Sequence, residues 1–221
     1  YTQEELVARR LIIDKKPDLV VDVLNASAVE RNLYLAVQFL ELGVPVVLAL
    51  NMMDEATNKG LSIDLDKLSE LLKLPAVPTV ARREEGIDEL LDACIRQADA
   101  VRDARREPLF ISYGPDLDPV LEEMTRLIAE AGLLSDHYPA RWVAVKYMEG
   151  DEEIMDLGKD KEELHARLTA MVKKVSDHCQ ATLGSFPEAL VADYRYGFIA
   201  SLMRHGVLKR EHIRDRIALS D

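Results

Sequence analysis

The clearest change from apolar to polar positions lies at Val46–Asp54, which reads V-V-L-A-L-N-M-M-D. Five apolar residues, Val46–Leu50, follow one another without alternation and stop at the polar Asn51. A strand that is apolar on both faces is typical of a parallel sheet covered on both sides. The pattern therefore predicts a buried strand. Asn51 and Asp54 would lie just beyond its carboxyl end, where open α/β sheets bind ligands.

The first half of the chain alternates between strand-like and helix-like patterns. Mostly apolar segments predict two further strands, at Asp18–Leu24 and Ala76–Ala81. Apolar positions at helical spacing predict helices at Tyr1–Lys16, Val29–Leu42, Asp64–Leu74 and Ile87–Val101. A polar loop is expected between Asp54 and Gly60. This alternation predicts right-handed βαβ units and an α/β fold with a parallel sheet and flanking helices.

The character of the chain changes near Arg105. Leu109–Tyr113 is expected to form one short strand, and beyond it the pattern is helical. The expected helices are Asp118–Gly132, Ala140–Met148, Lys161–Leu183 and a segment from Phe186 to His205, before an amphipathic tail at Lys209–Asp221. We therefore expect two domains, an α/β domain over residues 1–106 and an all-α helical domain over residues 107–221.

Composition narrows the class of protein. The chain has 221 residues and a net charge of −12, which argues against binding to nucleic acid or to an anionic lipid surface. No stretch approaches the roughly 18 apolar residues that span a membrane. The start, Y-T-Q-E-E, does not resemble a signal peptide, and the missing initiator Met suggests a piece of a longer protein. Only 2 Cys are present, as expected for reduced thiols in the cytosol.

Asn51 and Asp54 carry the candidate chemistry. An Asp carboxylate can accept two hydrogen bonds at once, which matches the paired N–H donors on the edge of guanine. An Asn amide beside it can contact ring nitrogens and tie neighbouring loops together. The N-x-x-D spacing is a form of the guanine-specificity motif of GTPases. The same spacing also arises from an Asn that starts a loop and an acidic residue that caps a helix.

Several segments in this order resemble the cytosolic GTPase region of the bacterial ferrous iron transporter FeoB. Asn25–Leu35, read as N-A-S-A-V-E-R-N-L-Y-L, is similar to the family's D-A-S/T-x-L-E-R-N-L-Y-L. The resemblance continues through segments that cover nearly the whole chain: Glu41–Pro45, Leu48–Asp54, Val77–Arg82 with Gly86-Ile87, Arg141-Trp142, Met148–Asp151 and Ala192–Tyr196.

The resemblance implies a partial Ras-like P-loop GTPase sheet, then an all-α helical domain, then the membrane transporter domain. By position, Asn51 and Asp54 would recognise guanine, and Met52 and Met53 would pack beneath it. Val80 and Ala81 would offer backbone groups near the guanine oxygen, and Thr79 would support their loop. Val80 stands where the family usually has Ser, so one side-chain hydrogen bond would be lost.

The phosphate-binding motifs are absent from these residues. Neither G-x-x-x-x-G-K-S/T nor D-x-P-G occurs, and in the family both lie before the position of Tyr1. Without them the chain has no Lys for the phosphates and no hydroxyl for Mg²⁺. We therefore expect GTP or GDP, with Mg²⁺, as the cofactor of the intact protein. For this chain itself we expect no catalytic residue, no metal ligand and no GTP hydrolysis.

The resemblance implies a regulatory GTPase region in which GTP binding and hydrolysis gate Fe²⁺ import, at the cytoplasmic face of the bacterial inner membrane. Its expected partners are guanine nucleotide, its own membrane transporter domain and small accessory proteins of iron transport, but no nucleic acid. The alternative is a non-catalytic protein-interaction module built from a degenerate half G domain and its helices.

The remaining chemically active residues receive structural interpretations. Cys94 and Cys179 fall on apolar helical stripes and are interpreted as core thiols. Trp142 and the group Tyr194, Tyr196 and Phe198 are expected in the core of the helical domain. Glu149 and Asp151 are expected in a solvated loop, and Lys209–Arg216 on the solvated face of a terminal helix.

Overall fold

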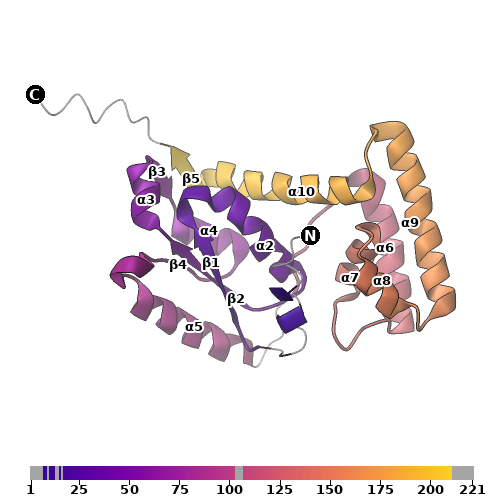
Figure 1. Ribbon diagram of the computed structural model, residues 1–221, viewed down its shortest axis with the longest axis horizontal. Helices are drawn as coiled ribbons and strands as arrows, with labels where there is room; N and C mark the ends of the chain where they lie inside the picture. The colour runs from indigo at the N-terminus through magenta and orange to yellow at the C-terminus, as the bar shows by residue number, and fades with distance from the viewer. Residues whose placement is uncertain (1–6, 9, 13–14, 16, 103–106, 211–221) are drawn as a thin grey trace, which may run out of the picture. The chain divides into compact units, whose positions relative to one another are not determined.

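The fold is described from a computed structural model, whose described residues are 7–8, 10–12, 15, 17–102 and 107–210 (Figure 1). The chain forms two compact units. One unit combines the residues up to Glu107 with those from Phe198 onward, and the other is Pro108–Gly197. The helix expected over Tyr1–Lys16 lies largely outside the described residues.

Within the described residues, the first unit is built on a parallel sheet with the order β1-β2-β4. Its strands are β1 (Val20–Asn25), β2 (Val46–Asn51) and β4 (Ala76–Pro78). The first five residues of β2 are buried, as the uninterrupted apolar run predicts. Helices α2 (Val29–Glu41) and α5 (Ile87–Arg102) lie on opposite sides of these strands (Figure 1). Val47 and Val77 of the sheet pack with Ala93 of α5. The α/β architecture is confirmed.

The stretch between β2 and β4 is more ordered than the pattern predicted. The expected polar loop contains helix α3 (Met53–Asn58), and strand β3 (Leu61–Ile63) follows it. Asp64 caps helix α4 (Leu65–Leu72) by accepting a hydrogen bond from the amide of Lys67. Strand β3 pairs in antiparallel fashion with β5 (Leu208–Arg210).

The second unit consists of helices in the part of the chain that the structure describes. They are α6 (Gly114–Ala131), α7 (Ala140–Met148), α8 (Glu152–Gly158), α9 (Glu162–Leu183) and most of α10 (Pro187–Leu202), which runs on into a π-helical turn at Met203–Val207. The expected extent of 107–221 differs at its end, because β5 returns to the first unit. The segment Lys209–Arg216 therefore begins in a strand, and its residues from 211 onward lie outside the described part.

The strand expected at Leu109–Tyr113 is absent from the described structure. The segment instead binds the first turns of α6, because the amide of Tyr113 and the hydroxyl of Ser112 both donate to the carboxylate of Asp118. Arg141 of α7 donates to the same carboxylate and to the carbonyl of Ile111. These polar contacts satisfy groups that a strand would have used for pairing.

Charged residues that were expected in a solvated loop are buried in the helical unit. Glu149 follows α7, and its carboxylate accepts hydrogen bonds from Lys146 and Arg195. The side chains are 7% exposed for Glu149, 1% for Lys146 and 0% for Arg195. Asp151 is also buried and caps α8 through the amide of Ile154. The solvated-loop interpretation was wrong, because the cations that compensate Glu149 come from α7 and α10.

The aromatic residues of the helical domain divide between core and surface. Trp142 is buried and stacks on Tyr138, as expected for a core residue. Tyr194 and Tyr196 are exposed, so their expected core role was wrong, and Arg195 between them takes the buried position. Cys179 is buried and Cys94 is partly buried, as the core-thiol interpretation required.

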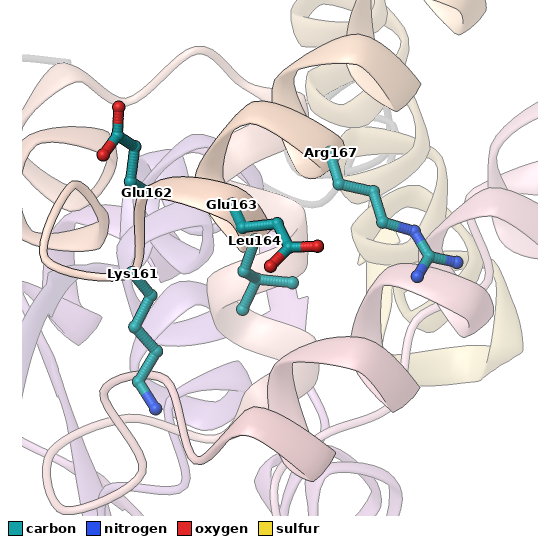
Figure 2. Close-up of a pocket in the computed structure, with 5 residues that line it drawn as sticks. All are labelled: Lys161, Glu162, Glu163, Leu164 and Arg167. Carbon is teal, nitrogen blue, oxygen red and sulfur yellow. The ribbon is translucent and has the colours of Figure 1, made fainter.

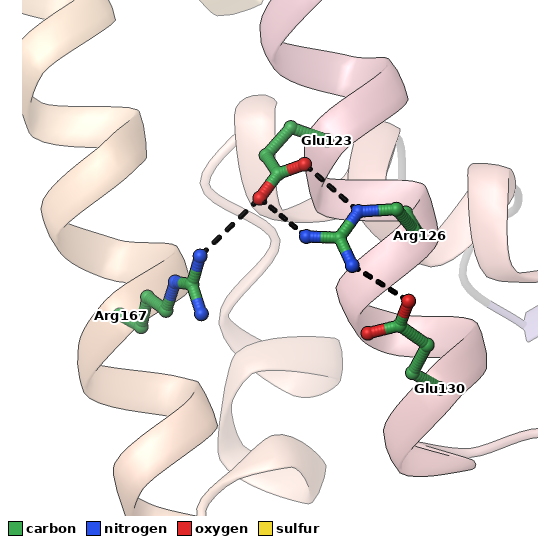
Figure 3. Close-up of polar contacts among 4 residues, drawn as sticks. All are labelled: Glu123, Arg126, Glu130 and Arg167. Carbon is green, nitrogen blue, oxygen red and sulfur yellow. Dashed lines mark hydrogen bonds and ion pairs between the residues drawn. The ribbon is translucent and has the colours of Figure 1, made fainter.

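Two surface features lie near the start of α9. A hollow of about 370 Å³ is lined by Lys161, Glu162, Glu163, Leu164 and Arg167, whose side chains diverge and carry both signs of charge (Figure 2). Beside it, Arg167 donates to Glu123 of α6, which also binds Arg126, and Arg126 binds Glu130 (Figure 3). All four side chains of this second cluster are well exposed.

Candidate functional site

The candidate site lies at the carboxyl end of β2. Asn51 is the last residue of that strand, and its Oδ1 accepts a hydrogen bond of 3.0 Å from the amide of Ala81. This bond ties the end of β2 to the loop after β4. Asn51 therefore joins two neighbouring loops, which is one of the roles expected for its side-chain amide.

The next three residues turn the chain into α3. Met52 has a left-handed backbone with φ of 63° and is exposed, and Met53 begins the helix. Asp54 is the second residue of α3, and its carboxylate accepts a hydrogen bond from the amide of Glu55. Met52, not Asp54, occupies the N-cap position, and it makes no side-chain capping bond. The two methionines and Asp54 thus follow the strand end directly.

The loop after β4 is held close to β2 by backbone hydrogen bonds. The amide of Thr79 donates to the carbonyl of Leu50 at 2.8 Å, and its own carbonyl accepts from the amide of Met53. The amide of Val80 donates to the carbonyl of Glu85 at 3.1 Å. Thr79 and Val80 are buried, whereas Ala81 is exposed. All seven residues expected at the site are therefore brought together. The amide hydrogens of Val80 and Ala81 are, however, engaged within the protein.

Two arginines that follow this loop, Arg82 and Arg83, lie against Asp54. They belong to the 3-10 turn Ala81–Arg83, which follows the loop at once. The guanidinium of Arg82 donates to the carboxylate of Asp54, and Nη2 of Arg83 lies 3.6 Å from the same oxygen. The sequence offered one signal for this contact. Two cationic residues come directly after the loop that was expected to lie near the Asp54 carboxylate.

These arginines determine the charge state of Asp54. Partial desolvation acts to raise the pKa of the Asp54 carboxyl. The hydrogen bonds from Arg82 and from the Glu55 amide, with the charges of both arginines, outweigh it and hold this pKa below its usual value. Asp54 is therefore an anion at neutral pH and can accept hydrogen bonds from paired donors.

Other kinds of site find no support in the described ranges. Within them, no group of three or more His, Cys, Asp or Glu side chains is arranged to hold a metal ion. None of the helices described is both long enough and apolar enough to cross a membrane.

Two family models match this chain, one in each half. The family model described as "Ferrous iron transport protein B" matches residues 1–94, and the model of the FeoB cytosolic helical domain matches residues 113–207. An Fe(2+) transport protein A/Fe(2+) transporter FeoB fusion protein of Porphyromonas gingivalis is 37% identical over an alignment of 212 positions, which covers 92% of this chain. The chain spans only 24% of that relative.

Solved structures give the same result. The cytosolic domain of FeoB from L. pneumophila is 30% identical, with a TM-score of 0.73 over 95% of this chain and 75% of that one. The mGMPPNP-bound NFeoB from S. thermophilus is 25% identical, with a TM-score of 0.75 over 96% of this chain and 76% of that one. The chain therefore belongs to the FeoB family, of which it carries part of the G domain and the cytosolic helical domain.

Proposed function

We propose that this chain supplies guanine recognition to the cytosolic region of a ferrous iron transporter. The observation that carries the proposal is the junction at the end of β2, where Asn51 binds the amide of Ala81 and Asp54 projects from the first turn of α3. The S. thermophilus relative described above is bound to a guanine nucleotide analogue, which supports the same ligand class here.

Each site residue has a role in this proposal. The Asp54 carboxylate accepts hydrogen bonds from the two adjacent N–H groups of guanine, and Asn51 holds the loop that faces the base. Met52 and Met53 pack beneath the ring, and Val80 and Ala81 line the side of the guanine oxygen with support from Thr79. No P-loop pattern occurs in the 221 residues, so the proposal concerns base recognition and not hydrolysis.

In the intact protein we expect GTP binding, with Mg²⁺, to regulate Fe²⁺ import at the cytoplasmic face of the cell membrane. Its partners would be the transporter's own membrane domain and small accessory proteins of iron transport. The family assignment does not favour the alternative of a non-catalytic interaction module, since both halves of the chain match FeoB models in order.

The test is isothermal titration calorimetry with GDP, GTP and ATP. The 221-residue chain is compared with a version extended through the upstream sequence of its gene, including any P-loop encoded there. The extended chain should bind GDP and GTP and discriminate against ATP. Asp54→Ala should weaken GDP binding by roughly 100-fold, because a base with paired donors loses its charged acceptor.

The matched control is Glu55→Ala, which removes the neighbouring acid of α3 and should leave GDP affinity within about twofold of the unmodified chain. Equal affinity for GDP and for an adenine nucleotide, or unchanged GDP binding by Asp54→Ala, would show that Asn51 and Asp54 serve only the structure of the loop.

A further inference from the structure

The carboxylate that the proposed function assigns to guanine is already in contact with an arginine. Arg82 donates to Asp54, and Arg83 lies 3.6 Å from the same carboxylate oxygen. The Asp54 side chain is 13% exposed, whereas that of Arg82 is 63% exposed. The contact therefore covers the acceptor with a side chain that lies mostly in solvent.

The chemistry of the two donors is closely matched. A guanidinium carries N–H groups on adjacent nitrogens of one planar carbon, and the edge of guanine that carries N–H donors has the same arrangement. Both bind a carboxylate in the same way. We propose that Arg82 occupies the place of the guanine edge on Asp54, so that base binding must displace it and Arg82 sets the affinity of the site. This inference rests on the proposed function.

The structure allows this displacement without rebuilding the loop. The turn that carries Arg82 is closed by hydrogen bonds from the amide of Arg83 to the carbonyl of Val80 and between Val80 and Glu85. Ala81 remains bound to Asn51. Only the arginine side chains need to move. A second carboxylate is at hand for Arg83, because Glu85 lies 3.8 Å from its Nη1.

The size of the effect follows from the exposure of the pair. When a site is partly occupied by its own side chain, the apparent affinity falls by the fraction of molecules in which the site is open. In an exposed ion pair, the equilibrium constant between the paired and the separated side chains is at most about five. Removing Arg82 should therefore tighten guanine binding by about three- to fivefold. Salt screens an exposed pair, so the gain should shrink as ionic strength rises.

The experiment measures GDP affinity by calorimetry for the extended chain, Arg82→Ala, Arg82→Lys and Arg83→Ala, at low and at high salt. We expect Arg82→Ala to bind about three- to fivefold more tightly than the unmodified chain at low salt, with the difference lost at high salt. Arg82→Lys should be intermediate because it keeps the charge without the planar fork. Arg83→Ala, the matched control, should change affinity less than Arg82→Ala.

A second measurement is made without nucleotide. A ¹³C NMR titration of the Asp54 carboxyl should show its pKa rising when Arg82 is replaced by Ala. Unchanged or weaker GDP binding by Arg82→Ala, while Asp54→Ala still weakens binding by roughly 100-fold, would overturn this inference and leave the proposed function standing. If neither the extended chain nor its Arg82→Ala variant binds guanine nucleotide, both this inference and the proposed function are overturned.

Discussion

Arginine binds a carboxylate in both compact units, but the two pairs differ sharply in burial. The pair of Arg82 and Asp54 lies at the surface of the first unit, whereas Arg195 and Glu149 are enclosed in the helical unit together with Lys146. In the exposed pair, another hydrogen-bond donor can replace Arg82 on the Asp54 carboxylate with little loss of free energy. Separating the buried side chains would leave a charge that neither water nor a partner compensates. The buried group therefore stabilises one arrangement of the helices.

A third carboxylate sharpens the contrast. Asp22 of β1 is buried, and its Oδ2 has no hydrogen-bond partner. Burial raises the pKa of Asp22 to about 6. Burial also acts on Glu149, but the charges and hydrogen bonds of Lys146 and Arg195 outweigh it and lower the pKa of Glu149 to about 2. The neighbouring cations, and not burial alone, decide the charge of an enclosed acid.

The largest effect is expected for Glu149→Gln, which removes the anion and leaves two buried cations. The free energy of unfolding should fall by about 3–5 kcal/mol in urea denaturation at pH 7. The exposed Glu152→Gln is the matched control and should change stability little. Because the pKa of Glu149 is lowered on folding, its stabilisation is present above its ordinary pKa and is lost as pH falls from about 4.5 towards 2. If Glu149→Gln lowered the free energy of unfolding no more than the control does, Glu149 would not be needed to compensate Lys146 and Arg195.

Asp22→Asn is expected to raise the free energy of unfolding, whereas Glu149→Gln lowers it, and the size of the change should be smaller. The raised pKa of Asp22 means that the native state holds a proton that the unfolded state releases. Stability should therefore fall as pH rises from about 4 through 6. Asp22→Asn should remove that fall and stabilise the chain by roughly 2 kcal/mol at pH 7.5, with little change at pH 4. Asp18→Asn, an exposed acid just before β1, is the control. A pH profile that the substitution leaves unaltered would refute this account of Asp22.

The smallest effect is expected for Arg126→Ala, in the exposed cluster shown in Figure 3. Despite its two carboxylate partners, the melting temperature should change by less than about 2 °C, and high salt should reduce even that difference. Thermal unfolding followed by circular dichroism would test this. A drop of more than about 5 °C would show that exposure alone does not separate the two kinds of ion pair.

The sequence predicted the α/β core because its elements are long or strongly patterned. The apolar run of Val46–Leu50 and the periodic segment beginning at Val29 became β2 and α2 nearly as expected. Helix α3 and strand β3 were missed, since both are short and β3 depends on a partner strand far along the chain. In α5, Leu91 and Ile95 are among the apolar residues whose spacing predicts a helix, yet they are exposed in the described structure, where Ala93 contacts the sheet.

At the site, the sequence located Asn51, Asp54 and the loop at Thr79–Ala81, because strand ends and the family motif coincide there. Their role in guanine binding stays a prediction. The contact of Arg82 with Asp54 was not predicted, since a run of charges in a turn gives no direction for its side chains. Glu149 was misjudged for a related reason. Next to Gly150 it resembles a loop residue, and its partner Arg195 lies on another helix.

The pairing of β3 with β5 has a consequence for how the chain folds as it is synthesised. All residues of the helical unit leave the ribosome before β5 does, so that unit can fold while the first is still incomplete. The small sheet closes only when Leu208–Arg210 arrive, and the backbone amide of Asp64 then donates to the carbonyl of Val207. Such distant pairing is slow to form. The first unit is thus expected to reach its final form last, although most of its sequence is made first.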